Sequence, residues 1–140
     1  METYFAAAKI GAIYIPLNFR AKVPELTFIL NNSEADTLFV GERYLSVIKE
    51  AKRSIPALKN VISIDKKVAD LLYYEDLIAS GSPEDIHVDV SDDDTTILLY
   101  TAGTTGMPKG VLLPHKSFSV YVVENFIIPQ NRRGGNNRRT

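Results

Sequence analysis

Short apolar runs alternate with amphipathic stretches along most of this chain. The runs are rich in β-branched residues and end at glycine, proline or charged residues, a pattern typical of buried strands. The expected strands are residues 13–15, 37–40, 61–64, 95–99 and 111–113. Between the runs, apolar residues recur at the spacing of a helix with one buried face. The expected helices are residues 5–10, 24–32, 42–55, 71–79 and 117–124.

Glycines and prolines mark the ends of several expected elements. Gly11 follows the alanine-rich first helix as a C-terminal cap would, and Pro24 suits the first turn of the second helix. Residues 84–94 are acidic without regular spacing, so we expect a solvated surface loop there. The loop also lacks the glycine of a calcium-binding EF-hand loop.

Alternation of strands and helices predicts an α/β fold, a mainly parallel sheet with flanking helices and right-handed crossovers. Ligands of such sheets bind at the carboxyl ends of strands. A loop with unusual chemistry begins at the end of the expected strand 95–99. We therefore expect the site of this protein at that end.

Residues 100–110 read Tyr-Thr-Ala-Gly-Thr-Thr-Gly-Met-Pro-Lys-Gly and carry this chemistry. Glycines let the backbone approach a ligand and let successive N–H groups converge on phosphate oxygens. Threonine hydroxyls add neutral donors, and a lysine ammonium adds a mobile positive charge. An ordinary hairpin loop of about two to five residues does not need three threonines and a lysine. The composition therefore favours a phosphate-binding loop over a plain turn.

The loop differs from a Walker A loop, because Pro108 stands where that pattern has its second glycine and Gly110 where it has a hydroxyl. Residues 100–110 instead resemble the signature loop of the AMP-forming acyl-adenylate superfamily. This superfamily includes acyl-CoA synthetases, peptide-synthetase adenylation domains and firefly-type luciferases, and its loop runs Tyr-Thr-Ser-Gly-Thr-Thr-Gly-x-Pro-Lys-Gly. The departure is Ala102, which replaces the usual serine and removes one hydroxyl donor. The Gly-Ala-hydrophobic run into Pro16, Leu17 and Asn18 extends the resemblance.

The resemblance implies an incomplete piece of the large N-terminal domain of the acyl-adenylate fold. It also implies that the loop holds the β- and γ-phosphates of ATP, which leave as pyrophosphate when a carboxylic acid attacks the α-phosphate. The residues implied to bind these phosphates are Thr101, Ala102, Gly103, Thr104, Thr105, Gly106 and Lys109. The implied small-molecule partners are a carboxylic acid, ATP, Mg²⁺ and coenzyme A. No catalytic residue or metal ligand is expected within this chain, and the magnesium ligand is expected in sequence that this chain lacks.

The composition is that of one globular domain: 140 residues, 45% of them apolar, with a formal charge of −1. The absence of cysteine excludes a disulfide framework and a thiol nucleophile, and fits a cytoplasmic protein. The apolar stretch near the amino end is broken by Lys9 and Gly11, so we expect neither a signal peptide nor a membrane span. His115 has no histidine or acidic partner at useful spacing, and we expect it to be a structural residue at a helix start.

The expected domain organisation is a partial adenylate-forming domain at residues 1–128 and a disordered basic tail at residues 129–140. The tail contains four arginines and no periodic apolar face. We favour a shifted reading frame or truncation over an RNA-binding tail, and expect no nucleic-acid partner. The chain then reads as a fragment of an acyl-CoA synthetase. A peptide-synthetase adenylation domain and a non-catalytic, truncated nucleotide-binding protein are the alternatives.

Overall fold

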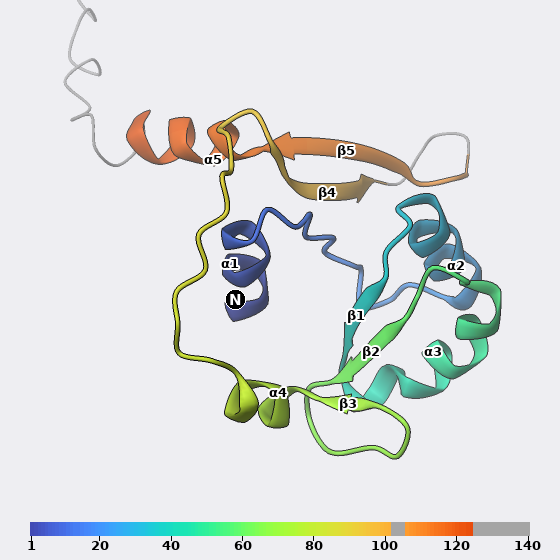
Figure 1. Cartoon of the computed structure of the whole chain (residues 1–140). Coiled ribbons are helices and arrows are strands. Elements are labelled where there is room, and N and C mark those ends of the chain that lie inside the picture. The colour runs from blue at the N-terminus through green and yellow to red at the C-terminus, as the bar shows by residue number, and fades with distance from the viewer. Residues whose placement is uncertain (102–105, 125–140) are drawn as a thin grey trace, which may run out of the picture. The chain divides into compact units, whose positions relative to one another are not determined.

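The computed structural model of the chain describes residues 1–101 and 106–124 (Figure 1). The chain divides into two compact units, which are described one at a time. The first unit comprises Met1–Ile15, Ile86–Leu99 and Val111–Thr140, and the second comprises Pro16–Asp85 and Tyr100–Gly110.

The second unit is built on a parallel three-stranded sheet in the order β1-β2-β3. Its strands are β1 (Thr37–Val40), β2 (Asn60–Ser63) and β3 (Leu72–Tyr73). In the register of the first pair, Leu38 lies opposite Val61 and Val40 opposite Ser63. Burial alternates along β1, so one of its faces points into the core, whereas the last three residues of β2 are all buried. This is the pattern of a central strand covered on both faces.

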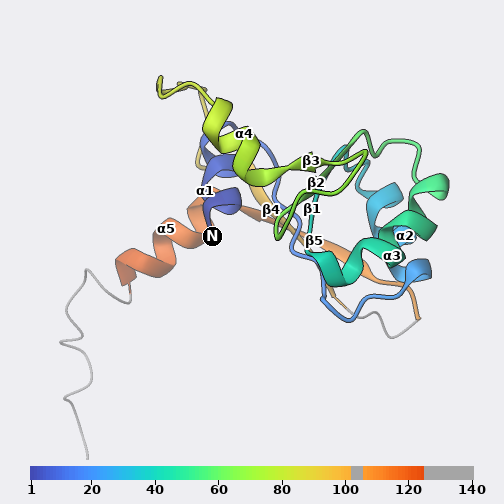
Figure 2. The same cartoon turned by 90° about the horizontal axis from the view of Figure 1, so that it is seen from below.

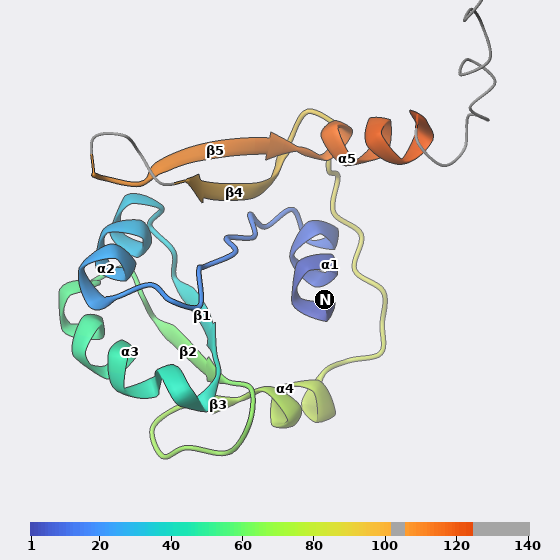
Figure 3. The same cartoon turned by 180° about the vertical axis from the view of Figure 1, so that it is seen from behind.

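Helices α2 (Val23–Asn32) and α3 (Leu45–Ala51) lie on the same side of this sheet (Figure 1, Figure 3). α2 buries Leu26, Ile29 and Leu30, one helical face, as the spacing predicts. The hydrophobic core joins both helices to β1 and β2. Its buried members are Leu26, Leu30, Leu38, Val40, Ile48, Ala51, Ile55, Leu58 and Val61. On the other face of β1, the ring of Phe39 meets that of Tyr74 edge-on, with 6.2 Å between centroids.

The carboxyl end of α2 is a Schellman turn. The N–H of Glu34 donates to the carbonyl of Asn31 (3.3 Å), and the N–H of Ala35 to the carbonyl of Leu30 (3.2 Å). Glu34 has a φ of 52°, in the left-handed region that glycine usually occupies at this position. The Ser33 hydroxyl adds a bond to the carbonyl of Ile29 (2.8 Å). The predicted end of this helix is therefore confirmed.

Two expectations for the second unit need correction. The helix expected at residues 42–55 is three segments: a 3-10 turn η1 (Glu42–Tyr44), α3, and a second 3-10 turn η2 (Lys52–Ser54). The helix expected at 71–79 begins later, because residues 72 and 73 pair with Ile62 and Ser63 of β2. Helix α4 (Tyr74–Ser80) then continues directly from β3 (Figure 2).

The first unit contains α1 (Glu2–Lys9), α5 (His115–Val122) and the amino-terminal part of β4 (Thr95–Thr101). Gly11 follows α1 with a φ of 70°, which confirms its capping role. Tyr4 connects the elements through ring contacts with Tyr14 (5.7 Å between centroids) and with Phe118 of α5 (6.3 Å). Before β4, residues 84–94 form no helix or strand, as expected.

The prediction of a strand at residues 13–15 is wrong. Only Tyr14 pairs, in one parallel bridge with Ile97: its N–H donates to the carbonyl of Thr96 and its carbonyl accepts from Leu98. The next N–H toward β4 in such a ladder would come from residue 16, which is proline and has none. The pairing therefore stops after one residue.

Within the described residues, no helix is long and apolar enough to cross a membrane.

Candidate phosphate-binding site

The candidate loop joins two paired strands, β4 and β5 (Lys109–Pro114), which run in opposite directions (Figure 1). It thus leaves the carboxyl end of a strand, as expected, but that strand is not in the three-stranded parallel sheet. β4 was also expected to be buried. Only Thr96 is buried along it, and Leu99 is 37% exposed.

Three of the seven predicted phosphate-binding residues lie in the described part of the chain. Thr101 is the last residue of β4 and Lys109 the first of β5; both are exposed. Gly106 lies between them, also exposed. The other four, Ala102, Gly103, Thr104 and Thr105, lie outside the described residues. The strands therefore bring a hydroxyl and an ammonium group, both exposed, to the two ends of the candidate loop.

Gly106 has a φ of 87°, which side-chain-bearing residues rarely adopt. A Cβ added there would meet no atom of the described structure within 4 Å. The backbone conformation, rather than lack of space, therefore requires glycine at this position. Such a backbone can turn successive N–H groups toward one anion.

Tyr100, directly before Thr101, makes a contact that the sequence did not reveal. Its hydroxyl donates a hydrogen bond of 2.6 Å to Oδ1 of Asn32, the last residue of α2. Partial burial raises the pKa of the Tyr100 hydroxyl above its ordinary value, and the nearby Ser33 side chain acts in the opposite direction. The hydroxyl is therefore a neutral donor at neutral pH. The sequence draws attention to Tyr100 because it belongs to the signature stretch. Nothing in the sequence indicates that its partner is Asn32.

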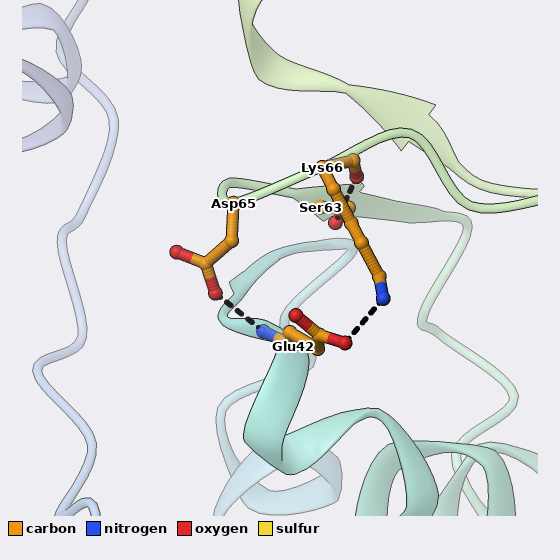
Figure 4. A network of polar contacts seen from close by, with 4 residues as sticks. All are labelled: Glu42, Ser63, Asp65 and Lys66. Atoms are coloured by element: carbon orange, nitrogen blue, oxygen red, sulfur yellow. Dashed lines mark hydrogen bonds and ion pairs between the residues drawn. The ribbon is translucent and has the colours of Figure 1, made fainter.

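The carboxyl ends of β1 and β2 are occupied by the protein's own polar groups (Figure 4). Oδ2 of Asp65 accepts a 2.6 Å hydrogen bond from the N–H of Glu42, and the Lys66 ammonium pairs with the Glu42 carboxylate. The Ser63 hydroxyl donates to the carbonyl of Lys66 (2.7 Å). These bonds hold the segments after the two strands together, so this edge of the sheet is structural.

His115 is the first residue of α5, as predicted, and its N–H donates to the carbonyl of Asp94 (3.0 Å). The neighbouring Lys116 ammonium forms an ion pair with Asp93, which raises the pKa of Lys116. These contacts tie the start of α5 to the loop before β4. Among residues 1–101 and 106–124, no group of three histidine or acidic side chains could hold a metal ion.

Comparison with known proteins adds an independent observation. The profile of a family described as AMP-binding enzyme matches residues 1–138. A medium-chain-fatty-acid–CoA ligase of Ectopseudomonas oleovorans is 32% identical over 124 residues, which cover 84% of this chain and 23% of the ligase. A 3-oxocholest-4-en-26-oate–CoA ligase of Rhodococcus rhodochrous is 37% identical over 122 residues, which cover 83% of this chain and 22% of that protein.

The fold has matches among solved structures. An anthranilate CoA ligase, AuaEII, crystallised with anthranoyl-AMP, superposes with a TM-score of 0.82 at 26% identity. The match covers 89% of this chain and 24% of AuaEII. The chain thus spans less than a quarter of each of these relatives and resembles their N-terminal part.

Proposed function

Because the chain belongs to the AMP-binding enzyme family, we propose that it is the phosphate-binding part of an AMP-forming carboxylic acid–CoA ligase. The single observation that carries this proposal is the signature stretch, whose Thr101 and Lys109 stand exposed at the two ends of one hairpin loop. The names of the relatives, which are ligases of acids to coenzyme A, support the same reaction.

In the proposed reaction, the carboxylate of the acid attacks the α-phosphorus of ATP. The bond to the bridging oxygen breaks, and pyrophosphate leaves with both electrons. The product is an acyl-adenylate, the kind of molecule bound in the AuaEII crystal. The thiol of coenzyme A then attacks the acyl carbon and AMP leaves.

The loop acts on the leaving group. Lys109 places a positive charge where negative charge develops on the departing pyrophosphate. Hydroxyls of Thr101, Thr104 and Thr105 donate to the phosphate oxygens, and so do N–H groups of Ala102, Gly103 and Gly106. The loop does not choose the acid. Among the described residues, no group of three histidine or acidic side chains could hold Mg²⁺. We also propose a cytoplasmic location, which the cysteine-free sequence favours.

Replacing Lys109 by alanine in an enzyme that contains this chain tests the proposal. We expect carboxylate-dependent ATP–pyrophosphate exchange to slow by roughly ten- to a thousand-fold, the range for losing one preorganised charged donor. Lys59→Ala is the matched control, because Lys59 is an exposed lysine of the second unit just before β2. An exchange rate that Lys109→Ala leaves unchanged would refute the role of the loop.

A further inference from the structure

The residue directly before the candidate loop is fixed to a distant part of the second unit. Tyr100 and Asn32 are 68 residues apart in sequence, yet their side chains share a 2.6 Å hydrogen bond. Tyr100 lies next to the start of the loop, because Thr101 follows it as the last residue of β4. Both residues belong to the same compact unit.

Asn32 stands on a rigid support. It is the last residue of α2, and the turn after it is closed by the bonds from Glu34 to Asn31 and from Ala35 to Leu30. Leu30 is 2% exposed and part of the hydrophobic core. The acceptor oxygen of Asn32 therefore sits on a helix end whose backbone is held from the core side.

A second bond fixes the same helix end in another direction. Nδ2 of Asn31 donates to the carbonyl of Ser54, the last residue of η2, at 2.8 Å. This bond joins α2 to the segment after α3 and does not involve Tyr100. The two neighbouring asparagines therefore bond to different elements. Asn31 bonds to η2, and Asn32 bonds to Tyr100 of β4.

We propose that Tyr100 and Asn32 form a positioning pair for the phosphate-binding loop. Their bond holds the carboxyl end of β4, and with it the backbone and hydroxyl of Thr101, before any phosphate arrives. A donor that is already in place gives more affinity, because the ligand need not order it. The inference rests on the proposed function of the loop and adds two residues to it, neither of which touches the ligand.

The test is a double-mutant cycle on the 140-residue chain, with inorganic tripolyphosphate as the probe and isothermal titration calorimetry as the measurement. Tyr100→Phe removes the hydroxyl and keeps the ring; Asn32→Ala removes the acceptor. We expect each to raise the dissociation constant by about two- to ten-fold, the effect of losing one hydrogen bond. The double variant should bind no more weakly than the weaker single variant, since both changes break the same bond.

Asn31→Ala is the matched control. It removes the bond to Ser54 from the same helix end and should lower the urea midpoint of unfolding, but should change the dissociation constant by less than about two-fold. If Tyr100 has a purely structural role, Asn31→Ala and Asn32→Ala should both weaken tripolyphosphate binding. The loss of affinity should then follow the loss of unfolding free energy in each variant. That result would overturn the positioning pair.

The Lys109→Ala variant distinguishes failure of the positioning pair from failure of the phosphate-binding loop. If Lys109→Ala weakens tripolyphosphate binding while Tyr100→Phe and Asn32→Ala bind like the unaltered chain, the positioning pair is wrong and the phosphate-binding loop stands. Multiplicative effects in the double variant would also overturn the pair. If the chain binds no tripolyphosphate, or binds it independently of Lys109, both proposals fail.

Discussion

At Tyr100, burial and hydrogen bonding act on the same hydroxyl. Burial disfavours the charged phenolate and raises the pKa of Tyr100 above its ordinary value, and the nearby Ser33 side chain partly offsets this. The protonated form is the one that can donate to Asn32. The contact at the root of the loop therefore persists at neutral pH and depends on a proton only in strong base.

This gives a prediction on alkaline stability. A pKa that is higher in the folded state than in the unfolded state contributes stability that is complete below pH 10 and is lost as the pH rises through the folded value. We expect Tyr100→Phe to flatten the fall of unfolding free energy above that pH, and to remove a late-titrating component from the tyrosinate absorbance. Tyr14→Phe is the control, because Tyr14 pairs through its backbone. Equal alkaline behaviour of Tyr100→Phe and the unaltered chain would contradict the raised pKa.

The sequence predicts a phosphate-binding role for residues of the candidate loop, but it gives no sign of the contact between Tyr100 and Asn32. Thr101, Gly106 and Lys109 are recognisable by type and spacing, and the positive φ of Gly106 agrees with the reason given for glycine. The bond between Tyr100 and Asn32 spans 68 residues. Nothing in the local pattern around Asn32 distinguishes it from Asn31, which faces a different partner.

The end of α2 holds one residue in a conformation that favours glycine. Glu34 adopts a φ of 52° to close the Schellman turn, a conformation that costs a residue with a Cβ roughly 1 kcal/mol more than glycine. The turn is otherwise complete, since both of its backbone bonds are formed. Glutamate at this position therefore lowers the free energy of unfolding relative to glycine.

We therefore predict that Glu34→Gly stabilises the chain by about 0.5–1 kcal/mol in urea denaturation, although glycine usually destabilises. Glu34→Ala is the matched control, because it removes the carboxylate but keeps the Cβ, and should not stabilise. A loss of stability in Glu34→Gly, or an equal gain in both variants, would show that the left-handed conformation is not the source of the effect.

The elements that the sequence predicted well are those whose apolar pattern matches the core. Residues 37–40 alternate in burial along β1, and residues 24–32 bury one helical face, so pattern and packing coincide. The failures have local causes. Pro16 limits the expected strand at 13–15 to one bridge, and β3 has only two residues, too few for a periodic signal. The first residue of η1, Glu42, donates its N–H to Asp65, a partner 23 residues away that no local pattern indicates.

The described part of the chain exposes much apolar surface. Large residues of β5 and α5 are prominent, among them Leu112 and Tyr121, each 61% exposed. Apolar patches of this kind usually mark surfaces that other segments or molecules cover. The chain spans less than a quarter of the two ligases and of AuaEII described above, and the loop acts only on the leaving phosphates in the proposed reaction.

We therefore predict that the 140-residue chain alone catalyses no adenylation. Rate enhancement depends on aligning the acid with the α-phosphate, and the loop positions neither the acid nor the α-phosphorus. The measurement is AMP release with ATP, Mg²⁺, coenzyme A and a panel of fatty and aromatic acids. Carboxylate-dependent AMP release above that of the Lys109→Ala chain would contradict the prediction.

The phosphate-binding loop can be tested directly by titrating the isotopically labelled chain with ATP and following its backbone amides by NMR. We predict that the amide signals of Thr101, Gly106 and Lys109 shift together, and that Lys109→Ala weakens the response at least about ten-fold. Lys59→Ala should respond like the unaltered chain. Shifts confined to other parts of the chain, or equal ATP affinities of the Lys109→Ala and unaltered chains, would contradict a phosphate-binding loop at residues 101–110.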